Sequence, residues 1–436
     1  MKILVVGSGG REHAILWALK NTSHRALDLY CAPGNAGIAQ IARCVSIDAS
    51  DIPSLAVFAA SEKVDLTFIG PEAPLAAGIV DQFQRRGLAI VGPSASAARL
   101  ESSKGFAKEF MTRHAIPTAR FKIARSVAEA LAVLRSGEFG EPNSAVVVKA
   151  DGLAAGKGVI VAPTRYAAEE AVRDLMTGGV VEPQAARQIL IEETLRGREA
   201  SLLVFADGRN YASMPAARDH KRIGEGDTGP NTGGMGAITD VSVLDAHLSN
   251  RIAGEIVEPT LAGAREEGFP FRGVLFIGLM LTDKGPSVLE YNVRFGDPET
   301  QAILLRLRTD LAEIFTAIEH GTLADTRVEW SEESSACVVL ASGGYPGSYE
   351  TGARIIGLDM ARTDHVEVFH AGTARSATGE WSTAGGRVLG VAAKGANLDE
   401  ALNRSYRAIS NINWEGMQYR RDIGRFLAEP SAVTGG

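Results

Sequence analysis

Three polar side chains recur at every second position in the stretch VLEYNVRFGDPE. Glu290, Asn292 and Arg294 alternate with apolar residues, so a β-strand here would point all three to one face, about 7 Å apart. Carboxylate and amide oxygens are the ligands that Mg²⁺ and Mn²⁺ prefer. The pattern predicts a metal site at Glu290 and Asn292, with Arg294 placed to meet the charge of a transferring phosphoryl group. The apolar residues between them, and Gly296 and Asp297 beyond, disfavour the alternative of a solvated strand face.

A second stretch, VVVKADGLAAGKGV at 146–159, brings two lysines and several glycines together. The valines predict a buried strand that ends at Lys149, and the glycines after it allow a ligand to approach the backbone closely. Lys149 and Lys157 could both bind a polyphosphate. The stretch is not a P-loop, because Gly158 stands where that motif needs Ser or Thr. We predict a flexible cover over phosphates, and the alternative is a plain hairpin with solvated lysines.

The N-terminal stretch VVGSGGREHA, 5–14, predicts a glycine-rich turn between a strand and a helix. Free backbone N–H groups and the helix dipole favour an anion at such a turn. A dinucleotide fingerprint would require glycine at the position of Glu12. The turn therefore favours a phosphate-sized ligand near Gly9, Gly10 and Arg11, and a merely tight turn is the alternative.

A third glycine-rich stretch, 217–237, combines a run of five charged or titratable residues at 218–222 with six glycines. Loops longer than ~12–15 residues are uncommon unless they are functional or disordered. We therefore predict a long loop that grips substrate or phosphate, with Asp219 and Lys221 as candidate catalytic residues. A solvated run of charges is the alternative. For His13, packing inside a helix and a role in the site stay equally open.

The elements that must position these residues follow from hydrophobic periodicity. Strands are predicted at 2–6, 27–31, 66–69 and 89–91, and helices at about 52–62 and 75–86. This alternation indicates a parallel sheet with right-handed crossovers. Further on, the sequence predicts a capped helix from Ser102, strands in QILIEETL and REASLLVFADG, a helix over 244–265, an antiparallel hairpin around 283–285, and a helix near 398–410. Acidic, serine-rich EWSEESS marks a domain boundary near residue 329.

Composition limits the class of protein. The chain has 436 residues, a net charge of −7 and no basic tract, so nucleic acid is not expected as a partner. Its three cysteines are widely spaced and form no CxxC pair, which disfavours disulfides and zinc. The start of the chain reads as a strand and not as a signal sequence, and no apolar stretch approaches the ~20 residues that cross a bilayer. We expect a cytoplasmic protein with no membrane partner, and a monomer.

Motifs from residue 1 to about 425 stand in an order that is typical of one family. They are GSGGREHA, GPEAPL, KADGLAAGKGV, IEETLRGREAS, DHKR, GPNTGGMGA, LEYNVRFGDPETQ and YRRDIG. With these motifs the chain resembles the phosphoribosylamine-glycine ligase family of the ATP-grasp superfamily. The resemblance implies an N-terminal parallel α/β domain (1–101), a two-part ATP-grasp core (102–190 and 191–328) and a small C-terminal α+β domain (329–436).

The resemblance also implies an activity and the residues that serve it. The activity is ATP-dependent joining of glycine to 5-phosphoribosylamine in purine synthesis, with Mg²⁺ or Mn²⁺ as cofactor. The implied ATP-binding residues are Lys104, Lys149, Gly156, Lys157, Glu192, Glu193, Thr194, Leu195 and Glu199. The implied metal ligands are Glu290 and Asn292, the substrate-binding residues are Gly9, Gly10, Arg11 and Asp297, and the catalytic residues are Asp219, Lys221 and Arg294. Thr194 stands where related sequences often carry an aromatic residue, which alters the packing of the adenine pocket.

The chemistry expected of such a site has a definite order. A carboxylate is a poor acyl donor, so glycine would first attack the γ-phosphate and form glycyl phosphate, which the amine then attacks. Water would destroy that intermediate, so the glycine loop at 151–158 is a candidate cover. Three alternatives stay open: another ATP-grasp carboxylate-amine ligase or carboxylase, a nicotinamide-dependent oxidoreductase, and a catalytically silent nucleotide-binding protein.

Overall fold

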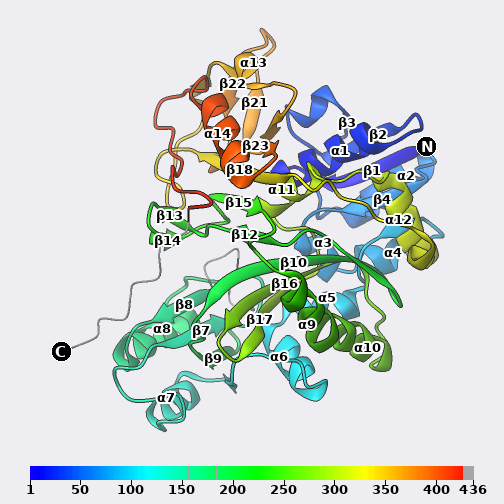
Figure 1. Ribbon diagram of the computed structural model, residues 1–436. Coiled ribbons are helices and arrows are strands. Elements are labelled where there is room, and N and C mark those ends of the chain that lie inside the picture. Colours follow the sequence, from blue (N-terminus) through cyan, green and yellow to red (C-terminus); the bar gives the residue numbers. More distant parts are fainter. Residues whose placement is uncertain (155–157, 183, 426–436) are drawn as a thin grey trace.

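The computed structural model describes residues 1–154, 158–182 and 184–425. Within these residues the chain forms a five-stranded, a four-stranded and a nine-stranded sheet, together with smaller ones. Figure 1 shows the nine-stranded sheet in the middle of the molecule. The N-terminal unit and the C-terminal strands lie toward one end of it, and the four-stranded sheet lies toward the other (Figure 1).

The N-terminal sheet is parallel, as the alternating pattern predicts. Its strands run in the order β3-β2-β1-β4-β5. They are β1 (Lys2–Gly7), β2 (Asp28–Pro33), β3 (Arg43–Cys44), β4 (Leu66–Ile69) and β5 (Ile90–Val91), and the helices are α1 (Gly10–Thr22), α2 (Ile52–Ser61), α3 (Glu72–Ala76), α4 (Ile79–Arg85) and α5 (Ala95–Ser102). The single helix expected over 75–86 is wrong: Gly78, with φ +82°, separates α3 from α4, because a left-handed residue cannot continue a right-handed helix.

The four-stranded sheet holds the valine-rich stretch between two other strands. Its antiparallel order is β6-β9-β7-β8. The elements of this unit are α6 (Lys104–Arg113), β6 (Phe121–Ala124), α7 (Val127–Arg135), β7 (Val146–Ala150), β8 (Val159–Ala162), α8 (Arg165–Thr177) and β9 (Ile189–Glu193). The predicted cap of α6 is confirmed, with Ser103 Oγ accepting a hydrogen bond from Phe106 N at 3.2 Å.

The large sheet is antiparallel and crosses the predicted boundary near residue 329. Its order is β17-β16-β10-β12-β15-β18-β23-β20, with β11 beside β10. The strands are β10 (Arg198–Asp207), β11 (Tyr211–Ser213), β12 (Ala217–Asp219), β15 (Gly236–Thr239), β16 (Arg272–Thr282), β17 (Gly285–Asn292), β18 (Ser334–Ala341), β20 (Val366–His370) and β23 (Arg387–Gly395). Because β18 pairs with β15, the C-terminal strands continue the same sheet. The domain boundaries therefore stay a prediction.

The stretch over 217–237 is not the long loop that its glycines suggested. Its ends are strands β12 and β15 of the large sheet, and between them β13 (Arg222–Gly224) and β14 (Thr228–Asn231) form a separate hairpin. The glycines supply turns and close approaches; Gly229, for example, has φ +76°. Strands only three or four residues long carry too little periodicity to be distinguished from a loop.

Helices connect and cover the sheets. The helix expected over 244–265 is present as α9 (Ala246–Ile252), a π-helical turn (Ala253–Val257) and α10 (Glu258–Glu266). The π-helical turn ends two residues before Pro259, which lacks the N–H that an unbroken α-helix would need there. Beyond β17 come α11 (Glu299–Leu304), α12 (Leu311–His320), α13 (Leu358–Ala361) and α14 (Leu398–Ile409), with β19 (Arg354–Ile355), β21 (Thr373–Arg375) and β22 (Trp381–Thr383) forming a small sheet. No helix in the described ranges is both long and apolar enough to cross a membrane.

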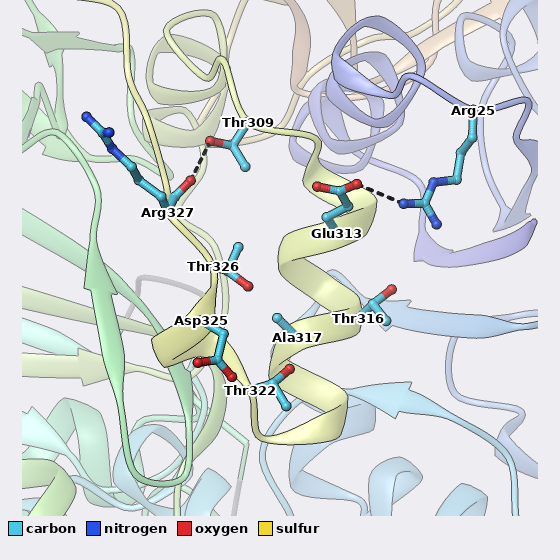
Figure 2. Close-up of a pocket in the computed structure, with 9 residues that line it drawn as sticks. All are labelled: Arg25, Thr309, Glu313, Thr316, Ala317, Thr322, Asp325, Thr326 and Arg327. Carbon is cyan, nitrogen blue, oxygen red and sulfur yellow. Dashed lines mark hydrogen bonds and ion pairs between the residues drawn. The ribbon is translucent and has the colours of Figure 1, made fainter.

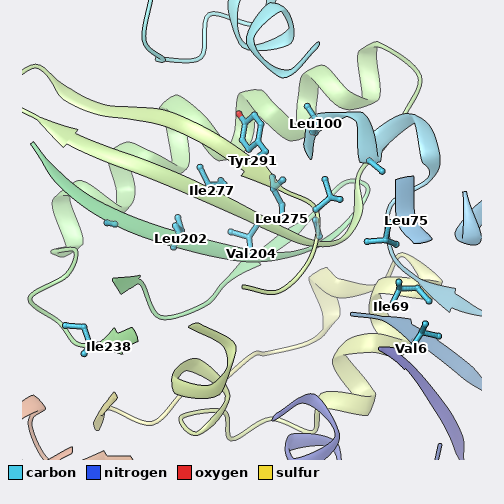
Figure 3. Close-up of a cluster of buried hydrophobic side chains, with 14 of the residues drawn as sticks. Val6, Ile69, Leu75, Leu100, Leu202, Val204, Ile238, Leu275, Ile277 and Tyr291 are labelled. Carbon is cyan, nitrogen blue, oxygen red and sulfur yellow. The ribbon is translucent and has the colours of Figure 1, made fainter. Parts of the chain in front are cut away.

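Buried apolar side chains run from the N-terminal sheet into the large sheet without a break. Figure 3 shows Val6, Ile69 and Leu75 on the N-terminal side and Leu202, Val204, Leu275 and Ile277 on the large sheet, all within one cluster. A second cluster joins the same units, with the Phe68 ring stacked on Phe315 at 4.4 Å between centroids and 5.7 Å from Phe295. This packing holds the N-terminal turn at a defined place beside the large sheet.

Phe68→Ala tests this junction. The substitution should lower the free energy of unfolding by about 3–5 kcal/mol, because it removes a stacked ring and leaves a cavity. Denaturant titration followed by circular dichroism measures the change. Tyr166→Ala is the control, since Tyr166 is 71% exposed, and it should change stability by less than about 0.5 kcal/mol. Equal stability of the two variants would contradict the assignment.

Candidate active site

The end of β17 carries a carboxylate that is surrounded by cations from distant segments. Burial alone would raise the pKa of Glu290, but Lys221, Lys149 and Lys104 lie near enough to lower it overall. Glu290 is therefore an anion at neutral pH, in a place half-shielded from water. A carboxylate of this kind, facing several lysines, is the arrangement in which a metal ion and a polyphosphate can bind together.

Two of these lysines come from the unit that contains the four-stranded sheet. Lys149 is the penultimate residue of β7 and is buried. Its Nζ donates to Leu289 O at 3.2 Å and lies 2.9 Å from Glu192 Oε2. Lys104, the first residue of α6, donates to Gly152 O at 3.2 Å. Burial lowers the pKa of Lys104, and Glu290 opposes that shift. The structure thus brings Lys149 and the Glu290 strand together.

Arg294 lies beyond the end of the strand that was expected to present it. β17 ends at Asn292, and Arg294 Nη2 donates to Asn292 Oδ1 at 3.2 Å. The guanidinium also forms ion pairs with Glu101 Oε1 at 3.0 Å and Glu72 Oε2 at 3.3 Å. Burial lowers the pKa of Arg294, but the two glutamates outweigh it and hold that pKa above its usual value. The sequence analysis missed both glutamates, which stand on separate helices of the N-terminal unit.

A second group of charges includes the predicted catalytic pair. Lys221 Nζ lies 3.0 Å from Glu199 Oε2, and Asp219 is the main cause of a raised pKa at Lys221. Burial raises the pKa of Asp219, while Lys221 opposes that shift. Burial and the charge of Asp219 raise the pKa of Glu299 to about 8, so this carboxyl is mostly neutral at pH 7. Lys221 thus lies among three acids, Glu199, Asp219 and Glu299, and the sequence analysis missed Glu299.

The N-terminal turn packs against the segment that follows Arg294. A Cβ on Gly9 would lie 3.7 Å from Asp297 Oδ2, and one on Gly10 would lie 2.8 Å from Gln301 Nε2. Arg11 Nη1 donates to Phe295 O at 3.1 Å. The structure therefore gathers the predicted substrate-binding residues in one place, although their sequence positions are far apart.

Asp297 is held by an arginine that the sequence analysis did not identify. Arg387, the first residue of β23, places Nη2 3.0 Å from Asp297 Oδ2, and its Nη1 donates to Asp297 O at 2.8 Å and to Gly233 O at 2.5 Å. Gln301 Nε2 donates to Asp297 Oδ1 at 2.8 Å. The C-terminal strands thus contribute to the site. The only sequence signal for Arg387 was a single charged residue at the start of the apolar stretch in GGRVLGV.

The segment expected to follow the adenine has two polar atoms without partners. Glu192 Oε1 and Thr194 Oγ1 are buried and accept no hydrogen bond from the described residues. Glu193 forms an ion pair at the surface, where Arg120 Nε lies 2.8 Å from its Oε2. Leu195 is half-buried. Gly156 and Lys157, at the centre of the predicted cover over 151–158, lie outside the described residues.

Both histidines that stood near the predicted sites have structural roles. His13 Nδ1 accepts a hydrogen bond from His370 N at 2.9 Å, and His220 Nε2 accepts one from Gly424 N at 3.0 Å. Burial lowers the pKa of His13 well below its ordinary value and that of His220 to about 4. Both are neutral acceptors, and they attach β20 and the segment at Gly424 to the rest of the molecule.

The metal ligands at Glu290 and Asn292 can be tested against the donors present. Across the described parts of the chain, no group of three or more His, Cys, Asp or Glu side chains is arranged to hold a metal by itself. One carboxylate and one amide leave most positions of a hard cation open. That donor set fits Mg²⁺ or Mn²⁺ when phosphate oxygens complete the coordination.

A cavity of about 350 Å³ lies elsewhere, beside α12 (Figure 2). Its lining is polar and includes Arg25 and Glu313, which pair with each other at 2.9 Å. None of the predicted site residues lines it. The charge cluster at β17 is the stronger candidate for the active site, because it holds buried charges and unpartnered polar atoms that a ligand would satisfy.

Comparison with known proteins covers the whole chain. Family models match in three consecutive parts: the phosphoribosylglycinamide synthetase N domain over 1–101, its ATP-grasp (A) domain over 102–300 and its C domain over 335–426. The phosphoribosylamine–glycine ligase of Xanthomonas axonopodis pv. citri is 48% identical, with 100% of each chain covered. That of Escherichia coli (strain K12) is 47% identical over 97% of this chain and 98% of its own.

Solved structures agree with the sequence comparison. A crystal structure of phosphoribosylamine–glycine ligase from Thermotoga maritima superposes with a TM-score of 0.83 at 33% identity, covering 97% of this chain and 100% of that one. A biotin carboxylase from Campylobacter jejuni, 15% identical, gives a TM-score of 0.72 over 97% and 93% of the two chains, which shows a shared fold. Three family models in sequence order, full-length relatives near half identity and this fold all agree: the chain belongs to the phosphoribosylglycinamide synthetase family.

Proposed function

We propose that this protein is an ATP-dependent ligase that joins glycine to 5-phosphoribosylamine, giving glycinamide ribonucleotide, ADP and phosphate in purine biosynthesis. Full-length relatives are named for this ligation. The observation that carries the proposal is the anionic Glu290 among lysines from three separate segments. The alternative, an ATP-grasp carboxylase or ligase with other substrates, gives no account of the N-terminal turn that packs on Asp297.

ATP is proposed to lie between β17 and the four-stranded sheet. Lys104 and Lys149 would bind its phosphates, since both reach the neighbourhood of Glu290. The unpartnered Glu192 Oε1 and Thr194 Oγ1 support an adenine along β9, because a buried acceptor without a donor is rare unless a ligand supplies one. Glu193, taken up by Arg120, would contribute through its backbone.

Glu290 and Asn292 are proposed to hold Mg²⁺ or Mn²⁺. When bound, such an ion neutralises charge on the phosphates and fixes their orientation. The lysines around Glu290 keep its carboxylate ionised and so ready to act as a ligand. Arg294, held in place by Glu72 and Glu101, is proposed to face the same phosphates with its guanidinium.

The remaining residues orient the two substrates. Glycine's carboxylate attacks the γ-phosphate to give glycyl phosphate, and the amine of phosphoribosylamine then attacks the activated carbonyl and displaces phosphate. Lys221 and Asp219 are proposed to steady the charges that develop in these steps. Gly9, Gly10, Arg11 and Asp297 are proposed to bind phosphoribosylamine, because the structure gathers them beside the charge cluster.

Glu290→Ala should lower kcat/KM by at least about 100-fold, because it removes the carboxylate ligand and leaves the surrounding lysines unbalanced. Steady-state assay of ADP release measures the loss, and circular dichroism checks the fold. Asp283→Ala, at the exposed turn of the same hairpin, is the control and should keep full activity. Near-normal turnover of Glu290→Ala would remove the metal assignment.

Labelled glycine tests the intermediate. With oxygen-18 in both carboxylate oxygens of glycine, one labelled oxygen should appear in the released phosphate, because the C–O bond to that oxygen breaks when the amine displaces phosphate. Mass spectrometry of the phosphate detects it. Unlabelled phosphate from a complete turnover would reject the glycyl phosphate route.

Arg387→Met should raise the KM for phosphoribosylamine by about tenfold or more, because Asp297 loses the cation that orients it. The KM for ATP should stay within about twofold, since Arg387 lies on the N-terminal-turn side of the site. Arg354→Met removes an exposed arginine of the C-terminal part, 72% exposed, and should change neither constant. A parallel rise of both KM values would contradict a substrate-specific role.

A further inference from the structure

A buried lysine, Lys108, belongs to the site but has no role in the steps above. It stands one helical turn after Lys104 in α6, so the two lysines lie on one face of that helix. Lys108 is only 2% exposed. A buried ammonium is costly unless it is paired, so its partner shows what it does.

The partner of Lys108 is the same carboxylate oxygen that pairs with Lys149. Lys108 Nζ lies 3.0 Å from Glu192 Oε2, and Lys149 Nζ lies 2.9 Å from that atom. All three side chains are buried. Two ammonium groups thus share one carboxylate, and the trio carries one net positive charge.

A second contact fixes the position of Lys108. Its Nζ donates to Thr118 Oγ1 at 2.7 Å, and Thr118 Oγ1 donates to Val288 O on β17 at 2.7 Å. Burial lowers the pKa of Lys108 to about 8, although Glu192 opposes that shift. Because this pKa lies above 7, Lys108 is mostly protonated at neutral pH.

Removal of Lys108 would change the charge that the trio presents. Glu192 would then be neutralised by Lys149 alone, and the pair would carry no net charge toward a nucleotide. With Lys108 in place, Glu192 is already compensated, so Lys149 keeps its positive charge for another anion. The two lysines therefore differ in role although both contact one oxygen: Lys108 compensates the carboxylate, and Lys149 is left to bind another anion.

We propose that Lys108 is a positioning residue for ATP, whose ammonium compensates Glu192 so that the charge of Lys149 remains available to the nucleotide phosphates. The inference rests on the proposed function, because it takes ATP as the ligand at Lys149. It assigns Lys108 no contact with ATP. Its action passes entirely through Glu192 and Lys149.

The test measures ATP binding by isothermal titration calorimetry with Mg²⁺ in the full-length protein. Lys108→Met keeps the length of the side chain and removes its charge, and the Kd for ATP should rise about tenfold or more. Glu192→Gln keeps the shape of the side chain and removes its negative charge. The Kd of the double variant for ATP should lie within about threefold of that of Glu192→Gln alone, because no carboxylate then remains to neutralise Lys149.

The matched control is Lys122→Met on β6. Lys122 is 51% exposed, and its Nζ lies 3.5 Å from Glu138 Oε1. The Kd of this variant for ATP should equal that of the unaltered protein. If Lys108→Met does not fold, the double variant carries the test, since it leaves no unbalanced carboxylate. The inference is overturned if Lys108→Met binds ATP as the unaltered protein does, if the double variant stays about tenfold weaker than Glu192→Gln, or if Lys122→Met weakens binding equally. If the unaltered protein does not bind ATP, the proposed function itself is overturned. If the unaltered protein binds ATP and only the variants depart from expectation, the role of Lys108 alone is overturned.

Discussion

The half-buried carboxylate of Glu290 places a constraint on the rest of the molecule. An anion shielded from water needs compensating cations, and none of the cations around Glu290 is its near neighbour in a helix or hairpin except Arg294. Lys104 and Lys149 come from the unit with the four-stranded sheet, and Lys221 comes from the segment after β12. The compensation is complete only when these units are packed together, so the site and the tertiary fold form at the same time.

Arginines extend this constraint outward from β17. Arg294 binds Glu72 and Glu101, which fastens the end of β17 to two helices of the N-terminal unit. Arg387 binds Asp297 and Gly233, which fastens the C-terminal strands to the same region. Planar guanidinium groups suit this task because they donate to several acceptors in fixed directions. The contacts that hold the units in place are thus the contacts that shape the site, with the continuous apolar clusters beneath them.

The local shape of the surface does not mark the candidate site. The cavity beside α12 is lined by side chains that already pair with each other, whereas the region of β17 and β9 is marked by buried charges and by polar atoms without partners. A ligand with phosphates and a base would satisfy both. The candidate site is therefore chosen by polar groups that lack a partner, and not by empty volume.

The sequence by itself determined the elements whose signals are local. Alternation and helical spacing predicted the parallel N-terminal sheet, the β16–β17 hairpin and α14. The two-residue spacing within one strand was enough to predict that Glu290 and Asn292 lie on the same face. Comparisons that cover the chain confirmed the family that the motifs indicated. The tertiary structure alone decided that β17 stops before Arg294 and that 217–237 forms short strands. It alone also brought Glu101, Glu299, Arg387 and the Lys108–Glu192 pair to the neighbourhood of the candidate site. The physical reason is that a charged residue has the same local pattern whether it faces water or a distant partner, and only packing determines which.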